Sequence, residues 1–147
     1  MAASEMEPRR YFEIRHVVGF AETSLMGNVY YAHYVGWQGL CREHFLRRHA
    51  PSVLDELAGG LSLATVRCSC DYLAELTAFD EVAIRMRLGE VRLNRVLMLF
   101  EYWRVRGSEE ELVARGEQEI ACLRRDGPRM VATPVPVALL EALEPYR

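Results

Sequence analysis

A run of four consecutive strand-like stretches after one long helical stretch is the strongest constraint on the fold of this 147-residue chain. Beyond Gly59-Gly60, the alternation of apolar and polar residues predicts strands at 61–72, 81–91, 96–106 and 112–124. Turn signals at Gly107-Ser108 and Asp126-Gly127-Pro128 fit the ends of the last two. Consecutive strands joined by short turns form antiparallel sheets, and one face of such a sheet must be covered. The sequence therefore predicts an α+β domain with a helix packed on an antiparallel sheet.

The stretch before Gly59 supplies the helix and one more strand. Residues 11–20 alternate well enough for a strand, and residues 1–9 are expected to form a disordered tail. Between Glu22 and Leu46, a turn built on Gly27 leads into a helix. Helical spacing predicts one apolar stripe, made of Tyr34, Trp37, Cys41 and Phe45. We therefore expect a single domain over residues 10–147, with five strands, this helix and a short closing helix at 136–143.

Composition excludes several kinds of function. All 18 basic residues are arginine, which excludes a Schiff-base lysine and a P-loop lysine. The net charge of -3 gives no reason to expect nucleic acid binding. The four cysteines lack zinc-site spacing, so we expect reduced thiols, no metal and no cofactor. Nothing in the first part of the chain resembles a signal peptide, and no apolar run reaches the roughly 18 residues of a membrane span. A cytoplasmic protein without membrane contact is expected.

A resemblance to a known family is concentrated between Phe20 and Leu46. This stretch resembles the 4-hydroxybenzoyl-CoA thioesterase family of hot-dog proteins through Phe20-Ala21-Glu22-Thr23-Ser24, Gly27, Val29-Tyr30-Tyr31, Tyr34, Trp37 and Arg42-Glu43. A further match is the step Asp71-Tyr72-Leu73. A narrower likeness, to thioesterases encoded with enediyne polyketide synthases, lies in Gly27-Asn28-Val29-Tyr30-Tyr31, Trp37-Gln38-Gly39 and Cys41-Arg42-Glu43. The resemblance implies a single hot-dog domain, in which an antiparallel five-stranded sheet wraps around a long central helix.

The resemblance also implies a reaction and partners. Such enzymes hydrolyse a polyenyl β-ketoacyl thioester on the acyl-carrier-protein domain of the synthase, and the β-keto acid then loses carbon dioxide to give a polyene or methyl ketone. Their subunits form dimers of dimers with active sites at the dimer interface, so a homotetramer is implied. An acidic carrier protein would be steered by outward arginines, for which the candidates are Arg47, Arg48, Arg85 and Arg87. Two alternatives stay open: a general acyl-CoA thioesterase and a non-catalytic acyl-binding hot-dog protein.

Three residues are the catalytic candidates that the resemblance assigns. Ser24 stands where many relatives carry an Asp, and a hydroxyl can hold water or a substrate oxygen but cannot replace a carboxylate base. The alternative for Ser24 is a turn residue that bonds its own backbone. Arg42 matches an arginine that the enediyne thioesterases use, and its guanidinium can hold a β-keto oxygen or a carboxylate. Tyr31 would supply its backbone N–H to an oxyanion. The general base stays unassigned.

Five residues are substrate-binding candidates, each with a structural alternative. Tyr30 and Tyr34 either contact substrate or pack in the core. Asn28 either contacts substrate or caps the helix. Glu22, on the same face as the serine if the chain is extended there, either replaces the missing acid or is solvated or paired. Thr65 either lines the channel from the partner subunit or is an ordinary strand residue.

Overall fold

The computed structural model describes residues 10–147, so the tail expected at residues 1–9 lies outside it. Along the chain, the elements are β1 (Phe12–Val17), a 3-10 turn (Phe20–Glu22), α1 (Ala32–His49), α2 (Pro51–Ala58), β2 (Leu61–Tyr72), β3 (Glu81–Arg92), β4 (Arg95–Arg106), β5 (Glu109–Asp126), β6 (Arg129–Ala132), α3 (Val137–Leu143) and a final 3-10 turn (Glu144–Tyr146). The five long strands and the closing helix confirm the expected element order. No helix of the described chain is long and apolar enough to cross a membrane.

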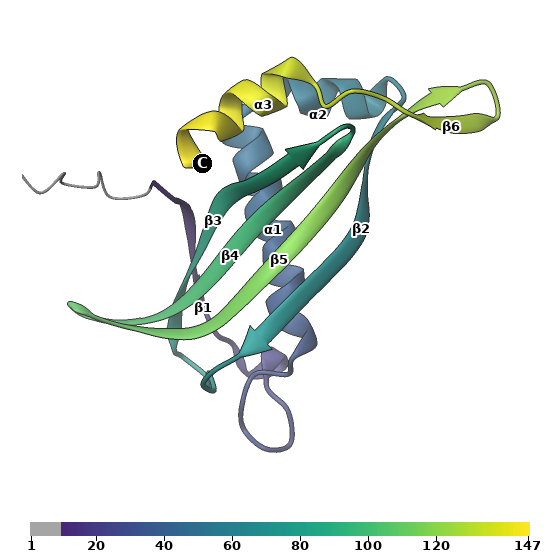
Figure 1. Cartoon of the computed structure of the whole chain (residues 1–147). Coiled ribbons are helices and arrows are strands. Elements are labelled where there is room, and N and C mark those ends of the chain that lie inside the picture. The colour runs from purple at the N-terminus through teal and green to yellow at the C-terminus, as the bar shows by residue number, and fades with distance from the viewer. Residues whose placement is uncertain (1–9) are drawn as a thin grey trace, which may run out of the picture.

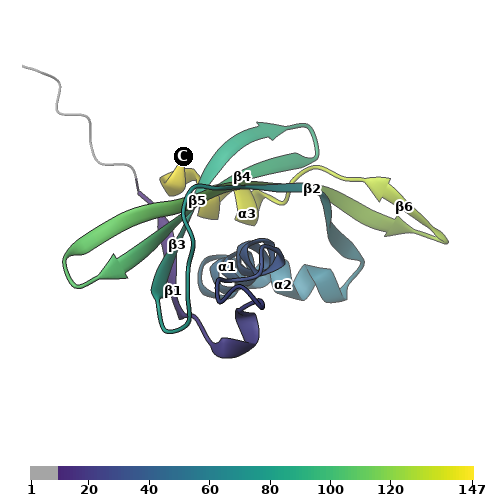
Figure 2. The ribbon, with the colours of Figure 1, turned by 90° about the horizontal axis from the view of Figure 1, so that it is seen from below.

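The strands form one antiparallel sheet in the order β1-β3-β4-β5-β2. This sheet curves over α1, while α2 and α3 lie at the end away from the loop that leads into α1 (Figures 1 and 2). The chain therefore has the predicted α+β hot-dog architecture. A sixth, short strand was not predicted: β6 turns back through Gly127 and pairs with the far end of β5. The strand β2 lies at one edge of the sheet and has a strand neighbour on one side only within the described chain.

The core lies between α1 and the concave face of the sheet. The four residues of the predicted helix stripe are at most 5% exposed, which confirms the helical period read from the sequence. On β3, Val82, Ile84, Met86 and Leu88 are buried beneath them, as strict alternation predicts. The helix ends at His49, and Pro51 begins a second helix that the sequence did not predict. Proline suits the first turn of a helix because the missing N–H has no intrahelical partner there.

A bulge in β2 changes which side chains of this edge strand face the helix. Thr65 pairs with Ile120, but the next pairs along the ladder are Arg67 with Glu119 and Cys68 with Gln118. An extra residue in one strand reverses the alternation beyond it. Cys68 consequently shares the helix-facing side of the sheet with Gln118. Arg67 lies on the outer side, where its side chain forms an ion pair with Glu117.

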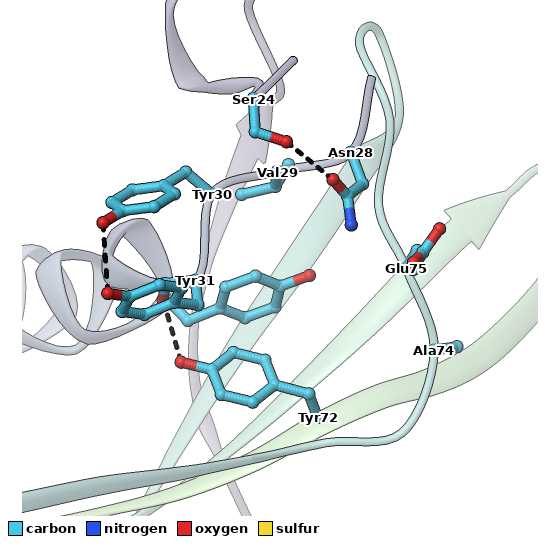
Figure 3. Close-up of a pocket in the computed structure, with 9 residues that line it drawn as sticks. Ser24, Asn28, Val29, Tyr30, Tyr31, Tyr72, Ala74 and Glu75 are labelled. Carbon is cyan, nitrogen blue, oxygen red and sulfur yellow. Dashed lines mark hydrogen bonds between the residues drawn. The ribbon is translucent and has the colours of Figure 1, made fainter. Parts of the chain in front are cut away.

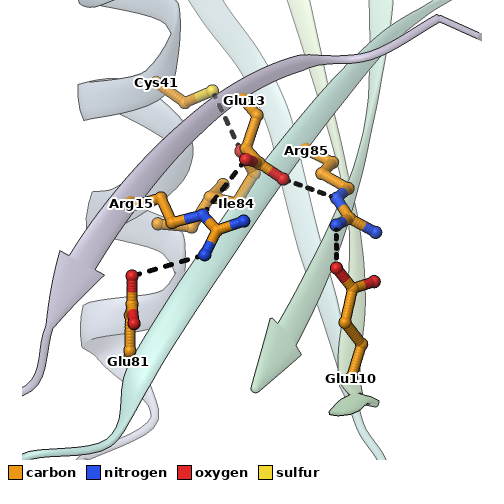
Figure 4. A network of polar contacts seen from close by, with 7 residues as sticks. All are labelled: Glu13, Arg15, Cys41, Glu81, Ile84, Arg85 and Glu110. Carbon is orange, nitrogen blue, oxygen red and sulfur yellow. Dashed lines mark hydrogen bonds and ion pairs between the residues drawn. The ribbon is translucent and has the colours of Figure 1, made fainter. Parts of the chain in front are cut away.

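Ion pairs cover part of the outer face of the sheet (Figure 4). Arg85 binds Glu13 and Glu110, each at 2.7 Å, and these carboxylates raise the pKa of its guanidinium, the bond to Glu110 most of all. Arg85 is thus occupied within its own sheet, which argues against the expectation that it steers a partner. The other three arginines expected to do so, Arg47, Arg48 and Arg87, form no ion pair with the described residues.

Candidate active site

A pocket of about 240 Å³ lies at the N-terminal end of α1 (Figure 3). It combines the loop before the helix with the end of β2 and the segment after it. Its lining residues are Ser24, Asn28, Val29, Tyr30, Tyr31, Tyr34, Tyr72, Ala74 and Glu75. Five of the predicted site residues are therefore brought together here. They are Ser24, Asn28, Tyr30, Tyr31 and Tyr34.

Ser24 uses its hydroxyl inside its own turn. The Oγ atom donates to Oδ1 of Asn28 at 2.9 Å and accepts from the backbone N–H of Met26 at 3.2 Å. The backbone N–H groups at both ends of the turn are bonded as well, Ser24 to Asn28 O and Gly27 to Ser24 O. This arrangement matches the turn alternative named for Ser24, although its hydroxyl also borders the pocket.

Asn28 does not cap the helix, so that alternative is wrong. The residue before the first turn of α1 is Tyr31, and no side chain among residues 10–147 makes a capping hydrogen bond there. Asn28 instead accepts the Ser24 bond, and its amide nitrogen is turned towards the pocket (Figure 3). An N–H donor at this position can bind a substrate oxygen.

Two tyrosines of the pocket, Tyr34 and Tyr72, stay neutral and do not act as bases. Burial raises the pKa of Tyr34 to about 12 and that of Tyr72 to about 12. The hydroxyl of Tyr72 donates to the backbone oxygen of Tyr31 at 2.8 Å, and the Tyr30 hydroxyl donates to that of Tyr31 at 3.1 Å (Figure 3). Tyr72 was not among the predicted site residues, and its only sequence signal was the step Asp71-Tyr72-Leu73.

The helix start leaves backbone donors available, among them the N–H groups of Tyr31 and Ala32. The N–H of Tyr31 makes no backbone bond within the described chain, whereas those of Tyr30 and His33 are both bonded. An unpaired N–H at a helix N-terminus, where the helix dipole is positive, suits a developing oxyanion. The geometry is therefore compatible with the role that the resemblance gives to Tyr31.

Glu22 lies outside the pocket. It sits in the 3-10 turn and not in an extended segment, so the expectation that it shares a face with Ser24 is wrong. Its carboxylate accepts hydrogen bonds from His16 Nε2 at 2.6 Å, Gly19 N at 3.0 Å and Trp37 Nε1 at 3.0 Å. Burial alone would raise its pKa, but these bonds together lower it. Glu22 joins β1 to the helix, and the three hydrogen-bond partners of its carboxylate all lie outside the pocket lining.

Arg42 forms a second polar group, further along α1. Its Nη1 atom donates to Gln118 Oε1 at 2.9 Å and lies 3.5 Å from Thr65 Oγ1. The guanidinium is half-buried, and burial lowers its pKa, against the field of Glu43. Thr65 thus lies beside the arginine of its own chain. No ion pair to Arg42 exists among residues 10–147, so its charge is held by neutral oxygens alone.

The two polar groups are separate within one chain. Arg42 follows Tyr31 by eleven residue steps along the helix, a rise of roughly 16 Å. A single carbonyl carbon cannot contact both. The predicted catalytic residues are therefore not brought to one point by this chain alone.

Gln38, one helical turn before Arg42, connects the helix to the edge strand. Its Nε2 atom donates to Ser69 O at 2.9 Å, and its side chain is fully buried. It passes over Gly116 of β5, where a Cβ would overlap the Gln38 amide and come within 2.8 Å of Ser69 O. The Gln38 Oε1 atom is buried without a hydrogen-bond partner in the described chain.

Comparisons with known proteins agree with this architecture. Residues 18–143 match the model of the thioesterase-like superfamily. The dynemicin thioesterase, whose crystal structures reveal induced fit and allosteric effects upon polyene binding, is 50% identical, with a TM-score of 0.89 over 93% of this chain and 97% of that one.

Two more distant structures share the fold. A 1,4-dihydroxy-2-naphthoyl-CoA thioesterase from Synechocystis is 18% identical, with a TM-score of 0.78 over 91% of this chain and 96% of that one. The 4-hydroxybenzoyl CoA thioesterase from Pseudomonas sp. strain CBS-3 is 21% identical, with a TM-score of 0.76 over 90% and 99%. No match was found among curated proteins. On the family match and the 50% identity, the chain belongs to the thioesterase-like superfamily, in the family of the dynemicin thioesterase.

Proposed function

We propose that this thioesterase releases a polyenyl β-ketoacyl chain from the acyl-carrier-protein domain of an enediyne polyketide synthase by hydrolysing the thioester. The observation that carries the proposal is the half-buried guanidinium of Arg42, which no carboxylate of the described chain neutralises. Such a group can bind a β-keto oxygen and a carboxylate with charge-assisted hydrogen bonds. The likeness to the dynemicin thioesterase supports a polyene as the acyl chain.

The proposed reaction has two stages. Water adds to the thioester carbonyl, and the oxyanion accepts a hydrogen bond from a helix N-terminal N–H such as that of Tyr31. The carbon–sulfur bond then breaks, which leaves a β-keto acid and the carrier thiol, and the thiol sulfur takes a proton. When the acid loses carbon dioxide, the electron pair of the broken bond remains as an enolate, and its protonation gives a methyl ketone. The Arg42 guanidinium stabilises negative oxygen in both stages.

A dimer of dimers is proposed as the working assembly. Two observations support it: the strand edge of β2 that has no neighbour in the described chain, and the separation of Tyr31 from Arg42 along α1. A two-fold axis beside β2 reverses the direction of α1 in the second copy. The N-terminal end of α1 in one copy then faces the later half of α1 in the other. Sedimentation equilibrium should give four times the chain mass of 16.9 kDa. A monomer at working concentration would contradict this arrangement.

We also propose a cytoplasmic location. All four cysteines are free thiols, which suits a reducing compartment. Labelling of free thiols in protein taken from unfractionated cells, compared with reduced and oxidised standards, tests this. Oxidised cysteines in freshly lysed cells would count against it.

The decisive experiment supplies the protein with a polyene-loaded synthase and measures released product by chromatography. We expect released polyene or methyl ketone with the wild-type protein, and a loss of at least about tenfold for Arg42→Ala, equal to roughly 1.4 kcal/mol of transition-state stabilisation. The same acyl chain on coenzyme A is the comparison substrate. Equal kcat/KM for both carriers would favour a general acyl-CoA thioesterase, and binding without turnover would indicate an acyl-binding protein.

A further inference from the structure

We propose that Gln118 is a positioning residue, which fixes the guanidinium of Arg42 and leaves its positive charge available to an anionic oxygen of the substrate. This inference rests on the proposed function, because that function places Arg42 in the active site. It adds a residue of β5 that neither the sequence motifs nor the family likeness singled out.

The contact itself is short and comes from a rigid element. Gln118 Oε1 accepts from Arg42 Nη1 at 2.9 Å, and the Gln118 residue is only 4% exposed. Its backbone lies between Met98 of β4 and Cys68 of β2, so β5 is paired on both sides at this point. A side chain buried on a doubly paired strand has few alternative rotamers. Gln118 can therefore hold the arginine in one orientation.

The neighbouring residues on β5 show that the neutral amide is the unusual member of its stretch. Glu117 and Glu119 flank Gln118, but strand alternation directs both to the opposite face. There Glu117 pairs with Arg67 and Glu119 with Arg95. Of these three consecutive residues, the two on the outer face carry a carboxylate, and Gln118, which faces Arg42, carries a neutral amide.

A neutral partner has a specific consequence for the arginine. A carboxylate at residue 118 would bind Arg42 as an ion pair and cancel most of its field in this half-buried position. An amide oxygen instead occupies one N–H and leaves the formal charge unchanged. Thr65, the other contact, is also neutral. Guanidinium has five N–H donors, so donors remain for a substrate oxygen.

The experiment is a double-mutant cycle with Gln118→Glu, Arg42→Ala and both changes together, using a 3-oxooctanoyl pantetheine thioester as the substrate. We expect Gln118→Glu to lower kcat by at least about tenfold in the wild-type background and to change kcat by less than about twofold in the Arg42→Ala background. Equal losses in both backgrounds would show that Gln118 does not act through Arg42. Gln118→Met, which removes the acceptor without adding charge, is run in the same cycle and should also lose its effect when Arg42 is absent.

A binding measurement makes the test independent of turnover. Decanoate serves as the probe of the anion site in calorimetry, and Gln118→Glu should weaken its binding by at least about tenfold without lowering the unfolding temperature. Arg67→Gln makes the same change of net charge on the outer face and should leave decanoate binding within about twofold. Unchanged decanoate affinity in Gln118→Glu would overturn the inference.

Failure of this inference can be told from failure of the proposed function. If Arg42→Ala keeps wild-type turnover, Arg42 is not in the active site and both proposals fall. If Arg42→Ala is impaired but Gln118→Glu is not, only the role of Gln118 is wrong.

Discussion

The amide of Gln38 occupies the space that a Cβ on Gly116 would fill, and from there it reaches the backbone oxygen of Ser69. Three elements meet at this contact: α1, β5 and the edge strand β2. The bond from Gln38 to Ser69 holds the edge strand next to the helix. Gly116 lies directly opposite Cys70, the next residue of β2, in the β2–β5 ladder. Thr65 and Gln118, the two side chains that contact Arg42, lie on the same strands, β2 and β5.

Gly116→Ala should therefore destabilise the protein. The new methyl group would come within 2.8 Å of Ser69 O, a backbone atom that can move only with its strand. Overpacking of this kind costs about 1–3 kcal/mol, and urea unfolding measures it. Gly39→Ala is the matched control, because a Cβ there meets open space and an alanine favours the helix by up to about 1 kcal/mol. Equal stability of the two variants would contradict the packing argument.

Most of the fold could be predicted because its elements are long and strictly periodic. The strand β3 places Val82, Ile84, Met86 and Leu88 at every second position before the bulge that precedes Val91, and the stripe of α1 repeats at helical spacing. The misses have local reasons. The strand β6 has only four residues, all of them exposed, so it is too short to show an alternation of apolar and polar residues. Pro51 cannot continue α1, but a proline can begin a helix, and it is the first residue of α2.

The site was predictable only where it is local in sequence. Residues from Ser24 to Tyr34 gather because the loop and the first helical turns are continuous in the chain. Gln118 lies 76 residues from Arg42, and their contact depends on the sheet register. A weak signal existed: a neutral residue between Glu117 and Glu119 in a predicted strand. It could not be interpreted without knowing which face of β5 meets the helix.

The pH dependence of stability should reveal the carboxylate of Glu22. Its pKa is lowered below the ordinary value of 4.5, because the hydrogen bonds from Gly19, His16 and Trp37 outweigh burial. Because the pKa of Glu22 is lower in the folded state, its carboxylate stabilises the fold at pH values above 4.5. This contribution is lost as the pH falls through the pKa of the folded state. Glu22→Gln should therefore be destabilising at neutral pH, with the difference from wild type shrinking in acid.

Urea unfolding of both proteins at about pH 7 and about pH 3.5 measures this change. Glu43→Gln is the control, since Glu43 is exposed and its side chain makes no hydrogen bond within the described chain. A difference for Glu22→Gln that stays constant across the acid range would contradict the linkage.

Ser24→Ala should affect stability more than catalysis. The hydroxyl is committed to the turn through Asn28 and Met26, and each hydrogen bond contributes about 0.5–1.5 kcal/mol. We expect kcat to stay above about a third of the wild-type value, against at least a tenfold loss for Arg42→Ala. Product release and urea unfolding are measured on the same preparations. A collapse of kcat at unchanged stability would instead place the Ser24 hydroxyl in the reaction.

Tyr72→Phe should disturb the start of α1. The Tyr72 hydroxyl donates to the backbone oxygen of Tyr31 at 2.8 Å, and the backbone N–H of Tyr31 is the proposed oxyanion donor. Removing this bond loosens the donor relative to the substrate, so kcat should fall by about three- to tenfold while KM changes little. Tyr30→Phe is the matched control, because within the described part of the chain the Tyr30 hydroxyl bonds only the hydroxyl of Tyr31. Steady-state kinetics on the pantetheine substrate compare the two, and equal effects would remove Tyr72 from the positioning of the helix start.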